Sequence, residues 1–150
     1  MRVSVRQAKT SDLPRLAELG RAAVAAGAYT DIGFNDDDFI EFASSIMNRP
    51  DSLVLVAEKE DGRVCGGIGI FVVPFYFNRA HTFIQEVFLW TDYPGTGHLL
   101  TRAVERLAKA RGAKQIMITL NTNTKRYARA SQYLSTNGYK HNESIYMRVL

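Results

Sequence analysis

The residues best suited to chemistry lie in one stretch, where an apolar run from Phe83 to Trp90 leads through a glycine turn into an amphipathic segment. The turn contains Gly95-Thr96-Gly97. A strand that passes through glycines into a helix N-terminus forms an anion site, because the first helical N–H groups are unpaired and the helix dipole favours negative charge. Glu86 is the one acidic residue of the apolar run. A buried carboxylate is costly without a partner, so Glu86 needs an explanation.

Hydrophobic periodicity and turn residues predict the elements that position this stretch. Strands are predicted at residues 2–6, 52–58, 64–73, 81–90 and 114–120, and helices at about 10–27, 35–49, 99–112 and 123–137. Pro74 is expected to end the third strand, and residues 139–150 are expected to form one or two closing strands. The middle strands should be antiparallel, and the strand at 114–120 should be parallel to its predecessor through a right-handed crossover.

Side-chain caps and glycine ends mark the expected helix boundaries. N-caps are expected at Thr10 or Ser11, at Asn35, and at Asn123 or Thr124. The resulting order is β-α-α-β-β-β-α-β-α-β, with room for one more strand. This order predicts an α/β (α+β) fold with a mixed sheet, and the length predicts a single domain over residues 1–150.

The charge is divided unevenly along a chain of 150 residues whose net charge is +4. Residues 1–100 carry 9 Lys and Arg against 13 Asp and Glu, whereas residues 101–150 carry 10 against 2. A cationic half that begins at the glycine loop favours an anionic ligand or nucleic acid, although solvated helix faces give the same pattern. Cys65 is the only cysteine, and no apolar window is long enough for a membrane span. With no signal-peptide core, these features indicate a cytoplasmic protein.

Three motifs in this order of elements resemble the GNAT superfamily of acetyl-CoA-dependent N-acetyltransferases. Residues 86–97, Glu-Val-Phe-Leu-Trp-Thr-Asp-Tyr-Pro-Gly-Thr-Gly, are similar to the family's Glu-[Leu/Val]-[Tyr/Phe]-Val-x-Pro-x-[Tyr/Phe]-Arg-Gly-x-Gly. Residues 112–116, Gly-Ala-Lys-Gln-Ile, resemble the family's entry to strand five, and Ala130 followed by Gly138-Tyr139 resembles its C-terminal motif. Each motif alone is common, but their joint spacing covers essentially the whole chain.

The resemblance implies a site for the acyl donor on the strand and the loop. Backbone groups of Phe88 and Leu89 would hold the pantetheine arm and the thioester carbonyl. The pyrophosphate would be bound by residues at the start of the third helix, namely Gly95, Thr96, Gly97, His98 and Leu99. The loop departs from the family pattern, because Asp92 stands where the family has Gln or Arg and Pro94 lies beside it. The backbone amides would then contribute more of the binding, with help from the Thr96 hydroxyl, Arg102 or His98.

Glu86 matches the family's general base, which accepts the proton of the amine through one or two waters. Amine substrates are protonated at neutral pH, so a base must generate the nucleophile before it attacks the thioester. The alternative is a structural Glu86 at the sheet edge, facing solvent or paired with an arginine.

The general acid is less clear from the sequence. The family's tyrosine, which protonates the leaving thiolate, falls on Leu134 here, and Tyr133 is adjacent. A slip of one residue would bring Tyr133 into the site, but one helical step rotates a side chain by about 100°. Tyr133 is otherwise a core or surface aromatic. Asn123 and Ser131 are further candidates for contacts with the cofactor.

The sequence predicts less specific roles for the other polar and aromatic residues. Cys65 has no nearby histidine and is expected to be structural, and the three histidines lack ligand spacing, so no metal site is expected. The resemblance implies that the acceptor site is lined by loop aromatics, namely Tyr29, Phe34, Tyr76 and Phe77. Asp31 and residues 36–38 either receive a cationic amine or only offset the helix dipole.

The sequence therefore predicts an acyltransferase that moves an acetyl group from acetyl-CoA to a primary amine by direct attack in a ternary complex. The alternative is a CoA-binding or protein-interaction module of the same fold without turnover. Nucleic acid ranks last among the partners because no nucleic-acid-binding motif is recognisable, and no membrane partner is expected. The acceptor amine is not identified, and a homodimer is left open.

Overall fold

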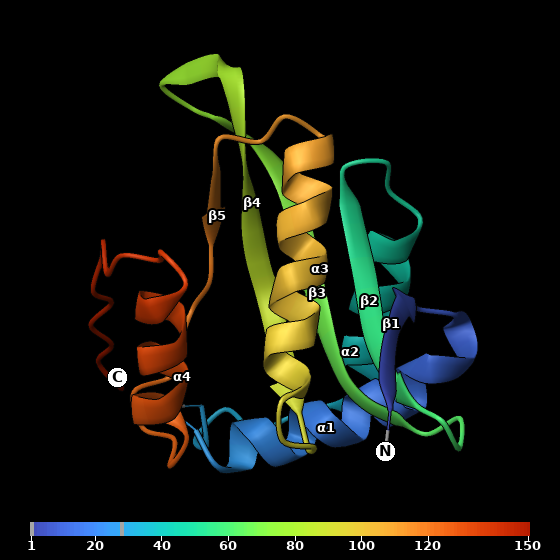
Figure 1. The fold of residues 1–150 in the computed structure, drawn as a ribbon. Coiled ribbons are helices and arrows are strands. Elements are labelled where there is room, and N and C mark those ends of the chain that lie inside the picture. The colour runs from blue at the N-terminus through green and yellow to red at the C-terminus, as the bar shows by residue number, and fades with distance from the viewer. Residues whose placement is uncertain (1, 28) are drawn as a thin grey trace. The chain divides into compact units, whose positions relative to one another are not determined.

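A five-stranded mixed sheet carries the elements that form the site (Figure 1). The computed structural model describes residues 2–27 and 29–150. The strands are β1 (Val3–Gln7), β2 (Ser52–Lys59), β3 (Val64–Phe75), β4 (Asn78–Thr91) and β5 (Gln115–Met117), in the spatial order β1-β2-β3-β4-β5. The first four strands pair antiparallel, and β5 pairs parallel with β4. These pairings confirm the predicted α/β fold with a mixed sheet.

The helices are α1 (Leu13–Ala25), which follows a 3₁₀ turn at Thr10–Asp12, α2 (Asp36–Met47), α3 (Thr96–Ala110) and α4 (Tyr127–Thr136). By their contacts, Met1–Thr119 and Leu120–Leu150 form two compact units, and each is described by itself. The sheet and α1 to α3 belong to the first unit, and α4 belongs to the second. That the two units make one domain stays a prediction.

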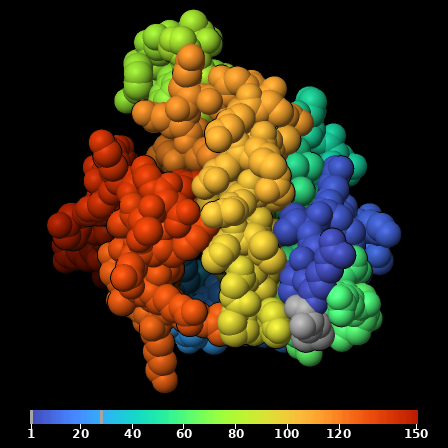
Figure 2. All heavy atoms as spheres, in the orientation of Figure 1, coloured from blue at the N-terminus to red at the C-terminus, as the bar shows by residue number. Residues whose placement is uncertain are grey.

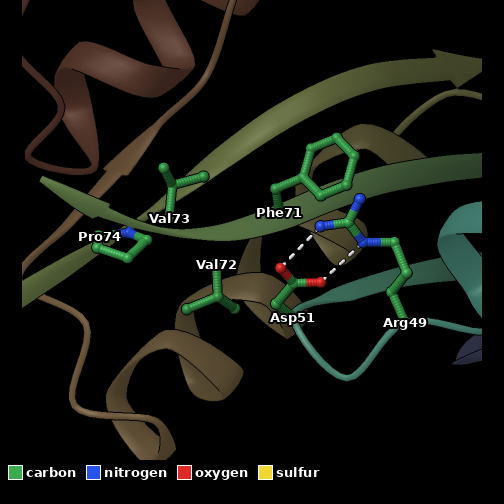
Figure 3. Close-up of a pocket in the computed structure, with 6 residues that line it drawn as sticks. All are labelled: Arg49, Asp51, Phe71, Val72, Val73 and Pro74. Atoms are coloured by element: carbon green, nitrogen blue, oxygen red, sulfur yellow. Dashed lines mark hydrogen bonds and ion pairs between the residues drawn. The ribbon is translucent and has the colours of Figure 1, made fainter. Parts of the chain in front are cut away.

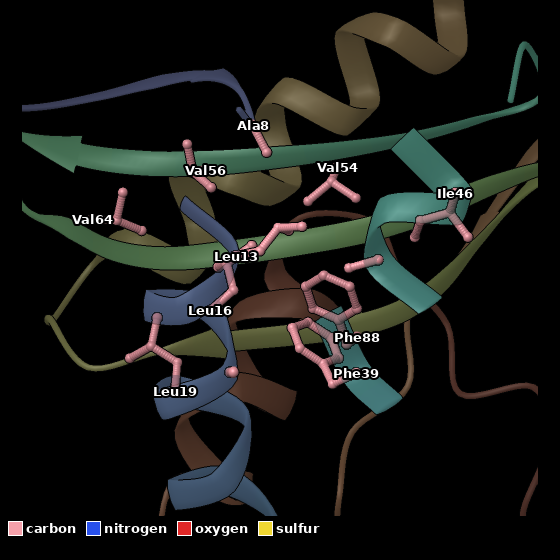
Figure 4. Packing of buried hydrophobic residues seen from close by; sticks show 12 residues of the cluster. Ala8, Leu13, Leu16, Leu19, Phe39, Ile46, Val54, Val56, Val64 and Phe88 are labelled. Atoms are coloured by element: carbon pink, nitrogen blue, oxygen red, sulfur yellow. The ribbon is translucent and has the colours of Figure 1, made fainter. Parts of the chain in front are cut away.

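Two apolar layers pack on opposite faces of the sheet, because alternate residues of a strand point to opposite faces. Val54 and Val56 of β2 face α1 and α2, whereas Leu55 and Ala57 face α3. Figure 4 shows the first layer, in which leucines of α1 and Phe39 of α2 lie against the sheet. Burial of each such large side chain contributes about 1.5–3 kcal/mol, so both layers are needed to hold the strands in register.

The glycines of β3 allow close approach to the sheet. A Cβ at Gly67 would lie 2.4 Å from Leu16 of α1, and one at Gly69 would lie 2.4 Å from the Phe88 ring. At the end of the strand, a Cβ at Gly66 would lie 2.7 Å from Thr96. α1, β4 and the start of α3 therefore converge on the glycines of β3.

Two of the three predicted N-caps are wrong. In each case a side chain other than the predicted one accepts a backbone hydrogen bond near the start of the helix. Asn35 caps α2 as expected, with its side-chain oxygen 3.1 Å from the Asp38 N–H. At α1 the carboxylate of Asp12, rather than Thr10 or Ser11, accepts the Lys9 N–H at 2.7 Å. Near α4, Asn121 accepts the Asn123 N–H at 2.9 Å, so this segment forms a turn and the helix begins only at Tyr127.

Three strand boundaries also differ from the prediction. β3 continues through Pro74, because residues beyond Phe71 no longer pair with β2 and the missing N–H costs no bond on that side. β5 is shorter than predicted. Residues 139–150 form no strand, so the prediction of one or two closing strands is wrong. Within the described residues, no helix is long and apolar enough to cross a membrane.

Two helical glycines make a test of the packing, because alanine should act on them in opposite directions. A Cβ at Gly20 of α1 would lie 2.4 Å from the Trp90 ring, so Gly20→Ala should lower the free energy of unfolding by about 1–3 kcal/mol. At Gly97 of α3 a Cβ meets nothing within 4 Å, so Gly97→Ala should raise it by about 0.5–1 kcal/mol. Urea unfolding of both variants measures this. Equal effects would contradict the packing described for α1.

Candidate active site

A β-bulge in β4 places neighbouring side chains on opposite faces of the sheet. Gly69 of β3 pairs with Phe88, but the next residue, Ile70, pairs with Glu86, so Val87 is left without an opposite residue. Glu86 therefore lies on the α3 side with Ile70, while Val87 and Phe88 both pack on the α1 and α2 side. Without the extra residue, Glu86 and Phe88 would share one face.

β4 and β5 separate at the position of Glu86. They pair at only three positions, Phe83 with Gln115, Ile84 with Ile116 and Gln85 with Met117. β4 then continues to Thr91, while β5 has ended. Past Gln85, the edge of β4 that faced β5 has no ladder partner among the described strands. Such an edge presents N–H and C=O groups to which an extended polar chain can bind.

The Glu86 carboxylate spans the point of separation. Its Oε2 accepts the backbone N–H of Thr119 at 3.0 Å, and the residue is 8% exposed. Burial raises the pKa of Glu86 from 4.5 to about 7, and the hydrogen bonds from Thr119 oppose this rise because they favour the charged form. The carboxyl group can therefore accept and release a proton near neutral pH. The sequence alternatives of a solvent-facing or arginine-paired Glu86 are both wrong.

Aromatic rings form a wall on the other face of β4. Trp90 stacks on Phe88, with ring centroids 4.6 Å apart, and packs 5.0 Å from Phe39 of α2. Phe34, from the loop before α2, lies edge-on to Trp90 at 5.8 Å. Gly20 of α1 makes room for this contact. Of the four aromatics predicted to line an acceptor site, Phe34 is therefore the one packed against the end of β4.

The glycine loop leads into α3 as the sequence predicted. Gly95 has φ +80°, which a residue with a side chain rarely adopts, and it is the N-cap of α3. Gly97, His98 and Leu99 follow in the first turn of α3, and that turn has no acidic residue. The start of a helix favours negative charge, so the loop has the features expected of an anion site, and its role in binding stays a prediction.

The Thr96 side chain faces the core, so its predicted hydroxyl contact with the pyrophosphate is wrong. The residue is 1% exposed, and its hydroxyl oxygen lies 3.7 Å from the Cys65 sulfur. Its backbone N–H is bonded to the Tyr93 carbonyl at 3.3 Å. Thr96 therefore fixes the loop on β3, and Cys65 is the buried structural cysteine that was predicted.

Asp92, which stands where the family has Gln or Arg, is paired with two arginines. Its carboxylate forms ion pairs with Arg15 of α1 and, at 3.1 Å, with Arg63 of the β2–β3 hairpin. Arg15 is held in turn by the Val64 carbonyl at 3.1 Å. No sequence pattern predicts these partners, because Arg15 and Arg63 lie 77 and 29 residues from Asp92. The negative charge at this position of the loop is thus compensated by neighbouring cations.

His98 lies in the first turn of α3 close to a cation. Partial burial, and then the charge of Arg102, lower the pKa of His98. Its imidazole is therefore neutral at pH 7 and can act as a hydrogen-bonding group rather than as a cation.

The structure brings some predicted site residues together and separates others. Glu86, Phe88 and Leu89 lie on β4, which leads directly to the loop at 95–99. Tyr133 and Asn123 belong to the unit of residues 120–150, so their roles stay predictions. Tyr76 and Phe77 lie in the turn before β4, about 30 Å from Glu86 along an extended strand at about 3.3 Å per residue. The β3–β4 hairpin extends away from α1 (Figure 1), so Tyr76 and Phe77 do not line one acceptor site together with Phe34 as predicted.

No group of three His, Cys, Asp or Glu side chains within residues 2–27 and 29–150 could hold a metal ion. The described site consists of a buried carboxylate, an open strand edge and a helix N-terminus.

Comparison with known proteins relates this geometry to one family. The sequence matches the model of the Acetyltransferase (GNAT) family over residues 19–132. No curated protein matches the chain. Among solved structures, the fold is similar to glucosamine-6-phosphate N-acetyltransferase from Arabidopsis thaliana (TM-score 0.73, 16% identity, covering 100% of this chain and 99% of that one).

Two further structures share the fold at similar distance. One is an aminoglycoside acetyltransferase from an uncultured soil metagenomic sample, with a TM-score of 0.73 and 19% identity, covering 99% of this chain and 95% of that one. The other is a transcriptional regulator from Bacillus halodurans C-125, with a TM-score of 0.79 and 18% identity, covering 99% and 100%.

The raised pKa of Glu86 predicts a stability that falls with rising pH. The unfolded carboxyl group loses its proton near pH 4.5, whereas the folded one keeps it to about pH 7, so the folded state binds more protons between these values. Glu86→Gln removes this pH-dependent loss of stability. Between pH 4.5 and 7, the free energy of unfolding of the variant should therefore rise relative to that of the wild type, by about 1–3 kcal/mol at 1.36 kcal/mol per pKa unit.

Urea unfolding of both proteins at steps from pH 4 to pH 8 measures this difference. Glu60→Gln, at an exposed position of the β2–β3 hairpin, is the control and should show no such trend. A pH-independent difference between wild type and Glu86→Gln would show that Glu86 titrates normally.

Proposed function

Because this chain belongs to the acetyltransferase (GNAT) family, we propose that it is an N-acetyltransferase that moves an acetyl group from acetyl-CoA directly to a primary amine, with Glu86 as the general base. Acetyl transfer is the activity of the family, and acetyl-CoA is its general co-substrate. The observation that carries the proposal is the Glu86 carboxyl group, which is buried and has a pKa of about 7 at the point where β4 and β5 separate.

Glu86 is suited to deprotonate the acceptor. An amine must lose a proton before it can attack a carbonyl carbon, and a base works best when its pKa lies near the working pH. An ordinary glutamate, with a pKa of 4.5, would be a much weaker base. The Thr119 N–H holds Oε2 of the carboxylate at 3.0 Å, and the carboxyl group, with a pKa of about 7, would accept the proton directly or through water.

The open edge of β4 is suited to hold the acyl donor. Acetyl-CoA supplies an activated acetyl thioester at the end of an arm that contains two amides. Backbone N–H and C=O groups of Phe88 and Leu89 would bind such an arm as a neighbouring strand would. An N–H group aimed at the thioester oxygen would also stabilise negative charge that develops there during attack. Backbone groups supply these contacts, so binding of the arm needs no particular side chain. It depends instead on the bulge and on the separation of β4 from β5, which expose the backbone.

The start of α3 is suited to the pyrophosphate. The helix supplies N–H groups at Gly97, His98 and Leu99 together with the positive end of its dipole. Asp92 lies close to this site in the chain, but its pairing with Arg15 and Arg63 reduces the repulsion that a phosphate would meet. The residues therefore fit an anionic cofactor even though the family's Gln or Arg is missing.

We assign Tyr133 as the general acid and Asn123 as a cofactor contact on the family resemblance alone. Leu134 occupies the family's tyrosine position. A thiol has a pKa of about 8.5, so its thiolate can leave without a strong acid. Turnover without Tyr133 would therefore be slower but not abolished.

The acceptor is proposed only as a class. Two similar structures are named for transfer to amino sugars, glucosamine-6-phosphate and aminoglycosides, so amino sugars are the first amines to test. The competing function is a CoA-binding module without turnover. It is favoured by Leu134 and by Asp92, which replace the family's side chains at those positions. The cytoplasmic location inferred from the sequence stays a prediction.

The base assignment predicts a defined loss of activity. Glu86→Gln keeps the Thr119 hydrogen bond but cannot accept a proton, so the rate of CoA release at pH 7 should fall by about 10²- to 10⁴-fold, the usual contribution of a general base. In the wild type, the rate should rise with pH through an apparent pKa near 7. A thiol-detecting assay with an amine panel measures both.

Glu60→Gln removes the same charge at an exposed site and should leave the rate unchanged. If Glu86→Gln retains the wild-type rate and pH profile, Glu86 is not the base. If the wild type binds acetyl-CoA but releases no thiol with any amine, the binding module is the better description.

The anion site predicts an effect of charge at Gly97. A side chain there enters open space, and Gly97→Asp places a carboxylate in the first turn of α3. This charge should stabilise the helix but repel the cofactor phosphates, so the affinity for CoA should fall at least tenfold while the melting temperature stays equal or rises. Isothermal titration with CoA and thermal unfolding measure the two effects. Gly97→Asn, which has the same shape without the charge, should bind much better than Gly97→Asp, and equal affinities would contradict the proposed phosphate site.

A further inference from the structure

The loop before α3 is fixed at points on either side of its glycines. A Cβ at Gly95 or Gly97 would meet nothing within 4 Å, so close packing does not hold these two residues. Between them, the Thr96 side chain is buried against Cys65. Towards β4, the Asp92 N–H donates to the Cys65 carbonyl at 3.1 Å. The position of the loop therefore depends on its contacts with the start of β3.

Three cations contact the part of the loop that follows β4. The Asp92 carboxylate pairs with Arg15 of α1 and, at 3.1 Å, with Arg63. The Lys59 ammonium lies 4.1 Å from the centroid of the Tyr93 ring, which is the distance of a cation–π contact. Arg15, Lys59 and Arg63 are here called the cationic clamp. In Figure 2 the start of α3, in yellow, and the β2–β3 hairpin, in green at the lower right, both lie on the visible surface.

The cationic clamp is itself held by the sheet and α1. Arg15 donates from Nε to the Val64 carbonyl at 3.1 Å, and it also pairs with Glu18 at 2.6 Å. α1 packs on the sheet through buried leucines, and Tyr93 packs against the apolar layer on the α3 side. A single exposed ion pair contributes little to stability, but several charges in one network restrict one another's positions. Asp92 is therefore tied to a rigid part of the molecule.

We propose that Asp92 is a positioning residue for the cofactor, because its ion pairs with the cationic clamp hold the loop, and with it the N–H groups at the start of α3, in place before the phosphates bind. This inference rests on the proposed function. It extends the cofactor site to the β2–β3 hairpin, and it explains why a carboxylate lies next to a phosphate site. A loop that is ordered before binding loses less entropy when the ligand binds.

The opposite signs of two effects make the proposal testable. If the Asp92 carboxylate acted only as a charge near the phosphates, Asp92→Asn would strengthen CoA binding, because it removes a repulsion. If Asp92 positions the loop, Asp92→Asn should instead weaken CoA binding by about 3- to 10-fold, since the ligand must then order the loop. Asp92→Glu keeps the charge that pairs with the arginines, so it should bind CoA more tightly than Asp92→Asn.

Isothermal titration with CoA, well below the melting temperature of each protein, measures these affinities. Asp51→Asn is the matched control, because it also breaks an exposed Arg–Asp pair. Arg49 donates to Asp51 at 3.0 and 2.9 Å, and the pair lies before β2, at the end of that strand opposite to Lys59 (Figure 3). Asp51→Asn should bind CoA like the wild type.

The outcomes separate this inference from the proposed function. A wild type that does not bind CoA contradicts the proposed function itself. A wild type that binds CoA, together with an Asp92→Asn variant that binds equally well or more tightly, overturns only the positioning role of Asp92.

A double-mutant cycle tests whether Asp92 acts through the cationic clamp. If Arg63 acts through Asp92, the double variant Asp92→Asn and Arg63→Gln should bind CoA no more weakly than Asp92→Asn alone. Additive losses would show that Arg63 has its own contact with the ligand, which overturns the clamp.

Amide hydrogen exchange without CoA tests the ordering of the loop independently of binding. Asp92→Asn should speed exchange at residues 93–99 by about threefold or more, because the loop opens locally more often, and should leave exchange in the middle of β3 unchanged. Exchange at residues 93–99 that is equal in the wild type and in Asp92→Asn would contradict the proposal.

Discussion

The separation of β4 from β5 is the constraint on which the candidate site depends. β4 and β5 pair only as far as Gln85, and the bulge at Val87 follows directly after this point. The bulge turns Glu86 to the α3 side and Phe88 to the α1 and α2 side. The open edge of β4 and the aromatic wall therefore begin at the same place in the chain, and the N–H of Thr119 binds the Glu86 carboxylate there.

The position of Glu86 costs stability and supplies chemical function at once. Desolvation disfavours its charged form, and the hydrogen bonds from Thr119 offset only part of that cost. The surrounding apolar layers contribute enough free energy to keep the carboxyl group inside. This balance, in which a rigid core holds a group in an unfavourable environment, is how proteins move the pKa of a general base toward neutrality.

The loop before α3 shows how charge at a distance changes the interpretation of a motif. Asp92 alone would repel a phosphate, but Arg15 and Arg63 from two other segments surround it. Thr96, which looked like a ligand contact, is an anchor between α3 and Cys65 of β3. The β3–β4 hairpin likewise holds Tyr76 and Phe77 away from Phe34, with which they were predicted to line the acceptor site.

The sequence alone determined the order of the elements as far as α4, the Asn35 cap, the glycine turn at Gly95 and the family, because periodicity, capping and turn chemistry are local. Only the tertiary structure decided the bulge, the separation of β4 and β5, the arginine partners of Asp92 and the inward side chain of Thr96. Each of these depends on contacts between residues far apart in the chain, and no local pattern encodes such contacts. The burial of Glu86, and with it the pKa that carries the proposed chemistry, belongs to this second group.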